Sequence, residues 1–443
     1  MKKILLSAMV LASTATFAQS WTVQNTGFSE PSRGINKINI VNPSTVWALA
    51  YDGIDLENDI QDFTRTTDGG NTWIPGNVDI AEGMGLTNIS AIDGMTAYVG
   101  AVSGDFGMGG VFKTTDGGVT WEGLNEENYV SEDSFFNVVH FFDANNGVTQ
   151  GDPINGAFEI FRTSDAGATW TAVTSPAPVS GEYGYNGGNP YAGNSFWFVT
   201  NKGNIYRTTD MGMSFQKFNA PLTDFGGTSA GGELIFSDNN TGMLIRRLGS
   251  TASPNYTMFR TFDGGATWDA GTPSTAPLGA GAFAYIPGTQ VIVKTSANSA
   301  NPGSAYSEDN GATWTTFGAA EQRISVKFFD ANTGWSGGFN TDENTGGIFK
   351  FDGSFALGTN DVAAAKNFTA SPNPTSGMLT LSSDNTTISE VYVLDMLGKQ
   401  VLNASFNSVN SASINMSGLN SGVYIVSTKD TNGKVEVMRV VKN

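Results

Sequence analysis

The stretch Thr67-Asp68-Gly69-Gly70-Asn71-Thr72-Trp73 recurs five more times along the chain with the same key positions. Each copy has an Asp, a Gly two residues later, a Thr or Ser after two more, and then an aromatic residue. Successive Asp residues are 45 to 53 residues apart, and they are Asp68, Asp116, Asp165, Asp210, Asp263 and Asp309. A repeat of this length exceeds that of most helical solenoids and suits a propeller blade of four strands. The repeat therefore predicts an all-β propeller.

Each copy lies between two strand-like runs, which predicts a hairpin turn. The Asp carboxylate is suited to accept hydrogen bonds from turn amides, and the Gly tolerates a positive φ. The Thr or Ser hydroxyl adds a second local hydrogen bond, and the aromatic ring packs over the turn. We therefore interpret the six Asp residues as structural groups of the turn rather than as catalytic acids.

The number of blades follows from what lies outside the six copies. The stretch Gly347-Ile348-Phe349-Lys350-Phe351-Asp352-Gly353 is a degenerate seventh copy whose following strand is missing. Near the N-terminus, residues 21–26 form a strand-like run with no copy ahead of it. We infer that this run completes the last blade, which closes the ring and leaves no open edge. The sequence thus predicts seven blades across residues 19–357.

Composition narrows the function classes. The chain has 443 residues, a formal net charge of −18, no cysteine and one histidine, His140. The acidic charge opposes binding to a nucleic-acid backbone. The lack of cysteine excludes disulfides, thiolate metal sites and cysteine nucleophiles, and a single histidine excludes a His-rich metal site. We expect no cofactor and no metal.

The first 18 residues have the pattern of a signal peptide. Lys2-Lys3 form a basic start, residues 4–12 an apolar core, and Thr16-Phe17-Ala18 a cleavage site of mostly small residues. The apolar run is too short to span a membrane, and no later segment is long and apolar enough to anchor the protein. We therefore expect export and a mature chain that begins at Gln19.

The chain changes character after the propeller. Residues 358–366 have Val362 as their one large apolar residue and predict a linker. Residues 367–443 contain several short alternating or apolar runs separated by turns, which predict a small Ig-like β-sandwich. An unrelated Ig-like binding module has the same pattern.

Four motifs in residues 367–443 occur in a recognisable order: a Pro-Asn-Pro-x-x-Gly opening, an Asp-x-x-Gly-Lys turn, a Leu-x-x-Gly-x-Tyr strand and a basic end. Their key residues are Pro372, Asn373, Pro374, Gly377, Gly398, Lys399, Gly422 and Tyr424. This segment resembles the type A C-terminal sorting domain of the type IX (Por) secretion system of Bacteroidetes. The resemblance implies recognition by the outer-membrane translocon and removal by a sortase-like peptidase. It also implies passage through the periplasm to a secreted or cell-surface location.

The repeated stretch resembles the Asp-box (BNR) repeat of sialidase-like propellers, in which the box lies on the rim, away from the substrate. Gly151-Asp152-Pro153 and the strand after it resemble photosystem II assembly-factor-like propellers, which have seven blades and act as protein-binding scaffolds. Sialidases use three arginines and a Phe/Tyr-Arg-Ile-Pro sequence, and this sequence is absent here. Four of the nine arginines precede the Asp-boxes at one equivalent place, so we interpret them as scaffold: Arg65, Arg162, Arg207 and Arg260.

One group of basic residues is distinct from the repeat. When the first strands of the blades are aligned, Arg323 and Lys327 take the same positions as Arg33 and Lys37. Blades seven and one are neighbours in a closed ring, and residues four apart on a strand share a face. The alignment predicts a basic cluster near the central channel, suited to an anion or a uronic acid. The alternative is that each side chain pairs with a nearby carboxylate.

Three irregular loops and His140 complete the candidate residues. Residues 182–191 are rich in Tyr, Asn and Gly, which suits contact with a sugar or a protein; their tyrosines are Tyr183, Tyr185 and Tyr191. Packing of this loop at a blade edge is the alternative.

Residues 52–59 offer alternating oxygens to Ca²⁺ but lack EF-hand features, so a solvated loop is favoured. Residues 126–133 form a second acidic loop, and we favour a core or channel role for His140.

The leading function hypothesis is an exported, non-enzymatic module that binds a glycan or a protein. The alternative is an extracellular polysaccharide-acting enzyme, either a glycoside hydrolase of sialidase-like type or a lyase. An enzyme requires two convergent carboxylates, or a Tyr with a basic partner, at one mouth of the channel. A binding module requires only an exposed aromatic and polar surface.

Overall fold

A computed structural model describes residues 19–103, 109–124, 128–131, 133–186, 189–228, 230–318, 321–355, 368–383, 386–395, 400–430 and 435–443. The chain divides into two compact units, Met1–Thr359 and Asn360–Asn443. The predicted signal peptide (1–18), the predicted linker (358–366), Gly398 and Lys399 lie outside the described residues.

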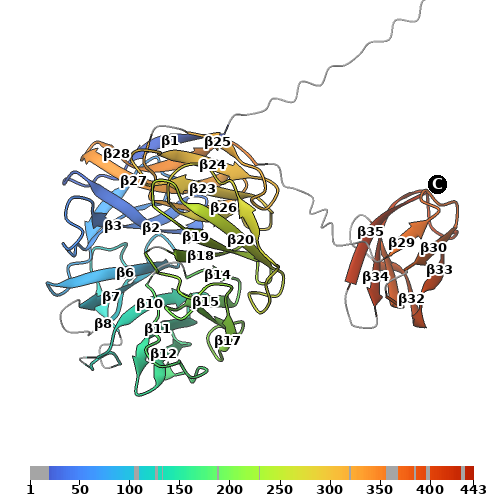
Figure 1. Ribbon diagram of the computed structural model, residues 1–443, viewed down its shortest axis with the longest axis horizontal. Helices are drawn as coiled ribbons and strands as arrows, with labels where there is room; N and C mark the ends of the chain where they lie inside the picture. Colours follow the sequence, from blue (N-terminus) through green and yellow to red (C-terminus); the bar gives the residue numbers. More distant parts are fainter. Residues whose placement is uncertain are drawn as a thin grey trace, which may run out of the picture. The chain divides into compact units, whose positions relative to one another are not determined.

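The first unit is a ring of antiparallel blades, each of four strands (Figure 1). Blade one contains β2 (Arg33–Asn42), β3 (Thr45–Asp52), β4 (Asp62–Thr66) and β5 (Ile74–Asn77). Blade two contains β6 (Met84–Ala91), β7 (Ala97–Ser103), β8 (Gly109–Thr114) and β9 (Glu122–Gly123). Blade three contains β10 (Phe136–Phe141), β11 (Gly147–Ile154), β12 (Ala157–Thr163) and β13 (Thr171–Ala172).

The remaining blades repeat this order. Blade four contains β14 (Tyr191–Ala192), β15 (Ser195–Val199), β16 (Asn204–Thr208) and β17 (Gln216–Asn219). Blade five contains β18 (Ala230–Phe236), β19 (Gly242–Leu248), β20 (Asn255–Thr261) and β21 (Thr272–Ser274). Blade six contains β22 (Phe283–Tyr285), β23 (Ile292–Ser296), β24 (Gly303–Ser307) and β25 (Thr315–Phe317). Blade seven contains β26 (Ser325–Asp330), β27 (Thr333–Asp342), β28 (Thr345–Asp352) and β1 (Ser20–Asn25).

The N-terminal strand closes the ring, as the sequence predicts. β1 pairs antiparallel with β28, in a register that runs from Ser20 opposite Asp352 to Asn25 opposite Gly347. Blades seven and one also meet at a bridge between Gly34 of β2 and Phe339 of β27. The first and last parts of the propeller are therefore held together by backbone hydrogen bonds.

Trp21 is the main side-chain contact of this closure. Its ring lies 5.8 Å from that of Phe317 and 5.6 Å from that of Phe351, between centroids, and it also packs against Phe328. The indole N–H donates to Ser304 Oγ over 3.0 Å. Because Phe317 and Ser304 belong to blade six, Trp21 fastens β1 to two blades at once.

The Asp-boxes are turns held by hydrogen bonds of the Asp side chain. In the second copy, Asp116 Oδ1 accepts the backbone N–H groups of Val119 and Thr120, and Thr120 Oγ1 donates to Asp116 Oδ2 over 2.6 Å. Gly118 has a φ of 87°, as the turn requires. The equivalent hydrogen bonds, led by that from the Thr169 hydroxyl, lower the pKa of Asp165 to about 2. The Asp residues are occupied within their own turns.

Sequence reasoning missed one member of the box. The hydroxyl of Thr114, two residues before the Asp, donates to Asp116 Oδ1 over 2.8 Å and accepts the N–H of Gly118 over 2.9 Å. The other five copies hold a buried hydroxyl at this position, in Thr66, Thr163, Thr208, Thr261 and Ser307. The seventh copy differs from the other six. Its Asp352 is the last residue of β28, but among the described residues the Asp352 carboxylate makes none of these hydrogen bonds.

The second unit is a sandwich of two antiparallel sheets. One sheet has the order β29 (Thr369–Ser371), β30 (Met378–Ser382) and β33 (Ser411–Asn415). The other has the order β32 (Gln400–Val409), β31 (Ile388–Leu394), β34 (Gly422–Asp430) and β35 (Val435–Lys442). Buried residues of both sheets form one core, including Leu379, Leu381, Val391 and Val426.

The motif residues of this unit support its last strand. Asn373 Nδ2 donates to the carbonyl of Arg439, and Asn373 Oδ1 accepts the N–H of Val441, each over 2.9 Å. Pro372 and Pro374 flank Asn373, and both follow cis peptide bonds. The Tyr424 hydroxyl donates to the carbonyl of Asn420 over 2.9 Å. The Pro-Asn-Pro opening is therefore bound to β35, which contains the basic end.

We predict that Trp21→Ala destabilises the propeller by about 3 kcal/mol, because it removes a large ring from a three-way aromatic contact. All nine tryptophans precede residue 336, so the intrinsic fluorescence reports the propeller alone during urea unfolding. Val23→Ala is the control, since Val23 lies on the same strand and is 49% exposed. Equal shifts in the two variants would contradict the assigned role of Trp21.

Candidate functional site in the central channel

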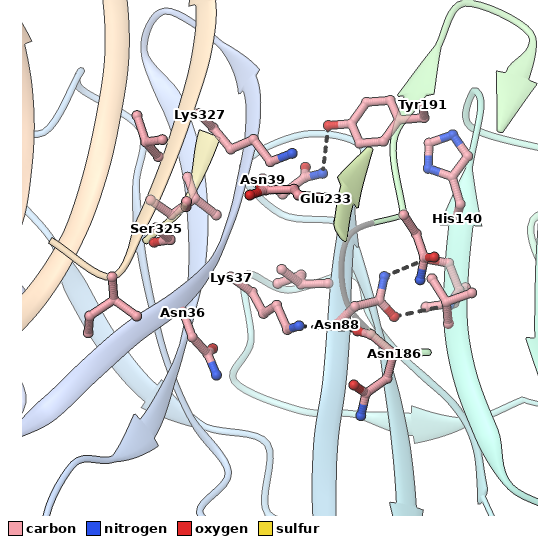
Figure 2. A pocket seen from close by; sticks show the side chains of 18 of the residues that line it. Asn36, Lys37, Asn39, Asn88, His140, Asn186, Tyr191, Glu233, Ser325 and Lys327 are labelled. Atoms are coloured by element: carbon pink, nitrogen blue, oxygen red, sulfur yellow. Dashed lines mark hydrogen bonds between the residues drawn. The ribbon is translucent and has the colours of Figure 1, made fainter. Parts of the chain in front are cut away.

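Residues of all seven blades line one cavity. Figure 2 shows side chains of this lining. The cavity has a volume of about 200 Å³. The innermost strands supply most of its lining: Asn36, Lys37, Ile38, Asn39, Asn88, Ile89, Val138, Val139, His140, Glu233, Phe283, Ser325, Val326 and Lys327. The loop before β14 adds Asn186 and Asn189, and β14 itself adds Tyr191. Two of the four predicted basic residues and one tyrosine of the Tyr-rich segment therefore line one cavity.

The structure separates the four predicted basic residues into two pairs. Lys37 and Lys327 line the channel, whereas Arg33 and Arg323 are not part of its lining. The alternation of β2 is interrupted by a register shift between Ile35 and Lys37, so Arg33 and Lys37 do not share a face in the expected way. Arg323 lies before the first residue of β26, and its backbone N–H bonds to the carbonyl of Ser296.

The two arginines have structural partners. Arg33 bonds to Asp52 over 2.9 Å and to Asp62 over 3.0 Å. Arg323 is 1% exposed, bonds to Glu321 over 2.7 Å and donates to the carbonyl of Gly318. Its guanidinium also lies 4.6 Å from the centre of the Phe349 ring. For these two residues the structure has the alternative arrangement, in which the charges are paired locally.

The charges of Lys37 and Lys327 are less well compensated by neighbouring groups than those of the two arginines. Lys37 Nζ donates to the carbonyl of Asn186 over 3.1 Å, and burial together with the charge of Lys327 lowers the pKa of Lys37 to about 8. Lys327 is exposed to the channel space and makes no hydrogen bond or salt bridge within the part of the chain that the structure describes. The protein around the channel partly desolvates the ammonium group and lowers the pKa of Lys327, an effect that Glu233 opposes.

Glu233 is the one carboxylate among the described residues that line the cavity. Both of its oxygens lie 3.2 Å from the backbone N of Phe283, which donates to them. Burial raises the pKa of Glu233 to about 7, although Lys327 and Lys294 act in the opposite direction. The lining that the structure describes thus holds no pair of carboxylates for glycoside hydrolysis.

Tyr191 and His140 form an aromatic stack on one side of the channel. Their ring centroids are 4.5 Å apart at 28°, and the ring of Phe196 also stacks on His140, 5.4 Å away at 12°. Tyr191 is 43% exposed, and its hydroxyl accepts a hydrogen bond from Asn39 Nδ2 over 3.4 Å. Burial lowers the pKa of His140 to about 3, so the imidazole is neutral at physiological pH. Its Nε2 is buried without a hydrogen-bond partner.

A buried carboxylate anchors the Tyr-rich loop. Glu182 is 4% exposed and accepts hydrogen bonds from Thr200, Asn204 and the N–H of Val179 at 2.7 to 2.8 Å. Lys217 adds an ion pair of 3.1 Å. Farther along the loop, the Tyr185 hydroxyl donates to Asp224 over 2.7 Å, while Tyr183 remains 45% exposed. Gly187 and Gly188 lie outside the described residues.

The acidic loops have a different environment. Asp52 accepts hydrogen bonds from Asn58 and from the N–H of Ile54, and these bonds lower its pKa. It also accepts the N–H of Asp55 and pairs with Arg33, so this carboxylate is occupied. Within the described ranges, no three acidic or His side chains gather in the way that a metal ion requires. Glu126, Glu127 and Glu132 lie outside those ranges.

Comparisons with known proteins agree with both units. Residues 370–443 match the family described as the secretion system C-terminal sorting domain. Residues 87–229 match the family described as photosynthesis system II assembly factor YCF48. No curated protein sequence matches the chain. The chain is thus an Asp-box β-propeller with a sorting domain for type IX secretion, which directs it to the cell surface or outside the cell.

Three solved structures are similar to the propeller. YCF48 bound to a D1 peptide is 14% identical, covers 76% of this chain and 98% of its own, and has a TM-score of 0.51. YCF48 from Cyanidioschyzon merolae is 12% identical, covers 76% and 99%, and has a TM-score of 0.49. The GH74 xyloglucanase from Xanthomonas campestris is 12% identical, covers 92% and 59%, and has a TM-score of 0.48. The first of these shares the fold with this chain.

In the described residues, no helix has the length and apolar character needed to cross a bilayer.

We predict that Arg323→Ala lowers the stability of the propeller by about 3 kcal/mol, because the stem and guanidinium fill space beside Phe349 and Trp21. Urea unfolding followed by tryptophan fluorescence measures the change. Arg260→Ala is the control and is expected to cost about 0.5 kcal/mol, since its side chain is 44% exposed beside Asp269. A variant as stable as the parent would show that Arg323 is not a packing residue.

Proposed function

We propose that this protein is an exported, non-catalytic binding module whose ligand enters the central channel. The channel site consists of Lys37, Lys327, Glu233, Tyr191 and Asn186. The observation that carries the proposal is the convergence in one cavity of two lysines, a partly exposed tyrosine and several amides. Such a lining binds an anionic or polar group of a glycan or a protein.

The chemistry of the channel site favours binding over turnover. Inverting and retaining glycosidases use two carboxyl groups roughly 5 to 9.5 Å apart. Glu233 is the single carboxylate in the described lining, and its neighbours are cations rather than a second acid. The phenol of Tyr191 is bonded to Asn39 and stacked on a neutral His140, so it has no basic partner within hydrogen-bond distance.

The size of the cavity limits what can enter. Sites for drug-sized molecules have volumes of roughly 300 to 1,000 Å³. A cavity of about 200 Å³ accommodates one residue of a polymer, such as a terminal or branching group. A similar propeller is described as bound to a peptide, which supports a macromolecular ligand.

We predict that the secreted chain captures a ligand without converting it. A glycan and peptide array identifies the ligand, and a turnover screen on the same compounds tests for products. Lys327→Met is expected to weaken capture about tenfold or more, because it removes one charge-assisted contact. Lys202→Met is the control, since Lys202 is exposed on a turn outside the cavity lining. Turnover that Glu233→Gln abolishes would replace this proposal with the hydrolase alternative.

For export, we propose the type IX translocon and a sortase-like peptidase as partners of residues 367–443. We predict that a chain ending at residue 357 accumulates in the periplasm, because it lacks the sandwich that holds the Pro-Asn-Pro opening against β35. Cell fractionation and immunoblotting of the two chains measure this. Normal surface display of the shortened chain would disprove the sorting role.

A further inference from the structure

We propose that the channel site binds the carboxylate of a uronic-acid residue in an acidic glycan, with Glu233 as an internal carboxylate that competes for the same lysines. The inference rests on the proposed binding function and specifies its ligand. It follows from the charges, the amide groups and the aromatic stack of the cavity.

The two lysines provide the anion-binding element. They belong to β2 and β26, the innermost strands of adjacent blades, and both side chains extend into the channel (Figure 2). Neither has a carboxylate within salt-bridge distance in the described residues, although the chain has a formal net charge of −18. The charge of Lys327 is close enough to lower the pKa of Lys37, and an anion placed between the two ammonium groups would offset this repulsion.

Amide groups of the lining provide polar contacts for a ligand. Asn36 and Asn186 are among the residues that line the cavity. Sugar hydroxyls donate and accept in one group, so they suit these amides. Asn189 Oδ1 and His140 Nε2 also belong to lining residues, but both atoms are fully buried and are not open to the cavity.

The aromatic stack supplies a surface for a sugar ring. Tyr191 is held on one face by His140 and at its hydroxyl by Asn39, so its position is fixed before a ligand binds. Tyr191 remains 43% exposed and lines the cavity. A rigid phenol with an exposed surface contacts the C–H groups of a pyranose without losing side-chain entropy. A ligand that has a carboxylate for the lysines, hydroxyls for the amides and a pyranose ring for Tyr191 is a uronic acid.

Glu233 makes this binding dependent on pH. The charged groups that face it are Lys327 of β26 and Lys294 of β23, and Tyr256 of β20 lies nearby. At about pH 6 Glu233 is mostly protonated and Lys37 is charged. As the pH rises through about 7, Glu233 ionises and neutralises part of the lysine charge, and above about 8 Lys37 loses its proton. Affinity for an anion therefore falls as pH rises.

Calorimetric titration of the full mature chain tests the inference, with oligomers of galacturonic, glucuronic and mannuronic acid as probes. At about pH 6 we expect one of the three to bind, and its methyl ester to bind about tenfold more weakly or worse. The affinity for the acid is expected to fall about tenfold between about pH 6 and 8.5, and the affinity for the ester to stay nearly constant.

Three variants separate the contributions. Lys37→Met and Lys327→Met should each weaken binding of the acid, whereas Lys202→Met should not. Glu233→Gln should strengthen binding at about pH 8 and remove the part of the pH dependence centred near 7, a change that a merely structural role would not produce. Tryptophan fluorescence during urea unfolding confirms that each variant is folded.

The outcomes distinguish the inference from the function on which it rests. Equal binding of acid and ester, or no binding of any uronate, would overturn the uronate inference. If a peptide or neutral glycan from the array then loses affinity in the Tyr191→Ala or Lys327→Met variant, the channel remains the binding site. If no ligand of the protein responds to any channel variant, the proposed function itself fails.

Discussion

Closure of the ring by β1 on β28 is the constraint on which the rest of the propeller depends. It sets blade seven against blade one, where Ser325 Oγ donates to the carbonyl of Ile35 over 2.8 Å. The two blades approach so closely at Gly337 that a Cβ there would lie 2.0 Å from the same carbonyl. Only a glycine permits this contact, and the contact brings β2 and β26 side by side. Lys37 and Lys327 therefore owe their proximity to the pairing of residues more than 300 positions apart.

The sequence was sufficient for the architecture because the fold repeats. Each Asp-box carries its turn chemistry locally, so six copies and the unpaired run at residues 21–26 predicted seven blades. The channel was harder to predict because it depends on side-chain direction. A register shift between Ile35 and Lys37 changes which residues of β2 face inward, and nothing in the local sequence marks it. Glu233 lies five residues before Asp238, and Lys327 three before Asp330, so strand alternation places both on one face. This spacing in the sequence could have predicted that Glu233 faces the channel.

The charges of the propeller fall into two kinds. Arg33, Arg323 and Glu182 are surrounded by partners of opposite charge or by several hydrogen bonds. Removing water from such groups is tolerable because these contacts replace it. Lys37, Lys327 and Glu233 lack this local compensation, and each has a pKa shifted toward its neutral form by burial. A scaffold gains nothing from such an arrangement, whereas a site that receives a charged ligand uses it.

The acidic surface of the protein bears on what kind of anion reaches this site. A net charge of −18 repels a long polyanion over a Debye length of about 8 Å at physiological salt. Steering from a distance is therefore unfavourable, and attraction begins only inside the channel, where added ions screen weakly. A chain that presents one carboxylate at its end or on a branch meets less of this repulsion than a chain lying across the surface. The small cavity and the acidic exterior thus select the same geometry, in which a single charged residue inserts and the rest of the polymer stays outside.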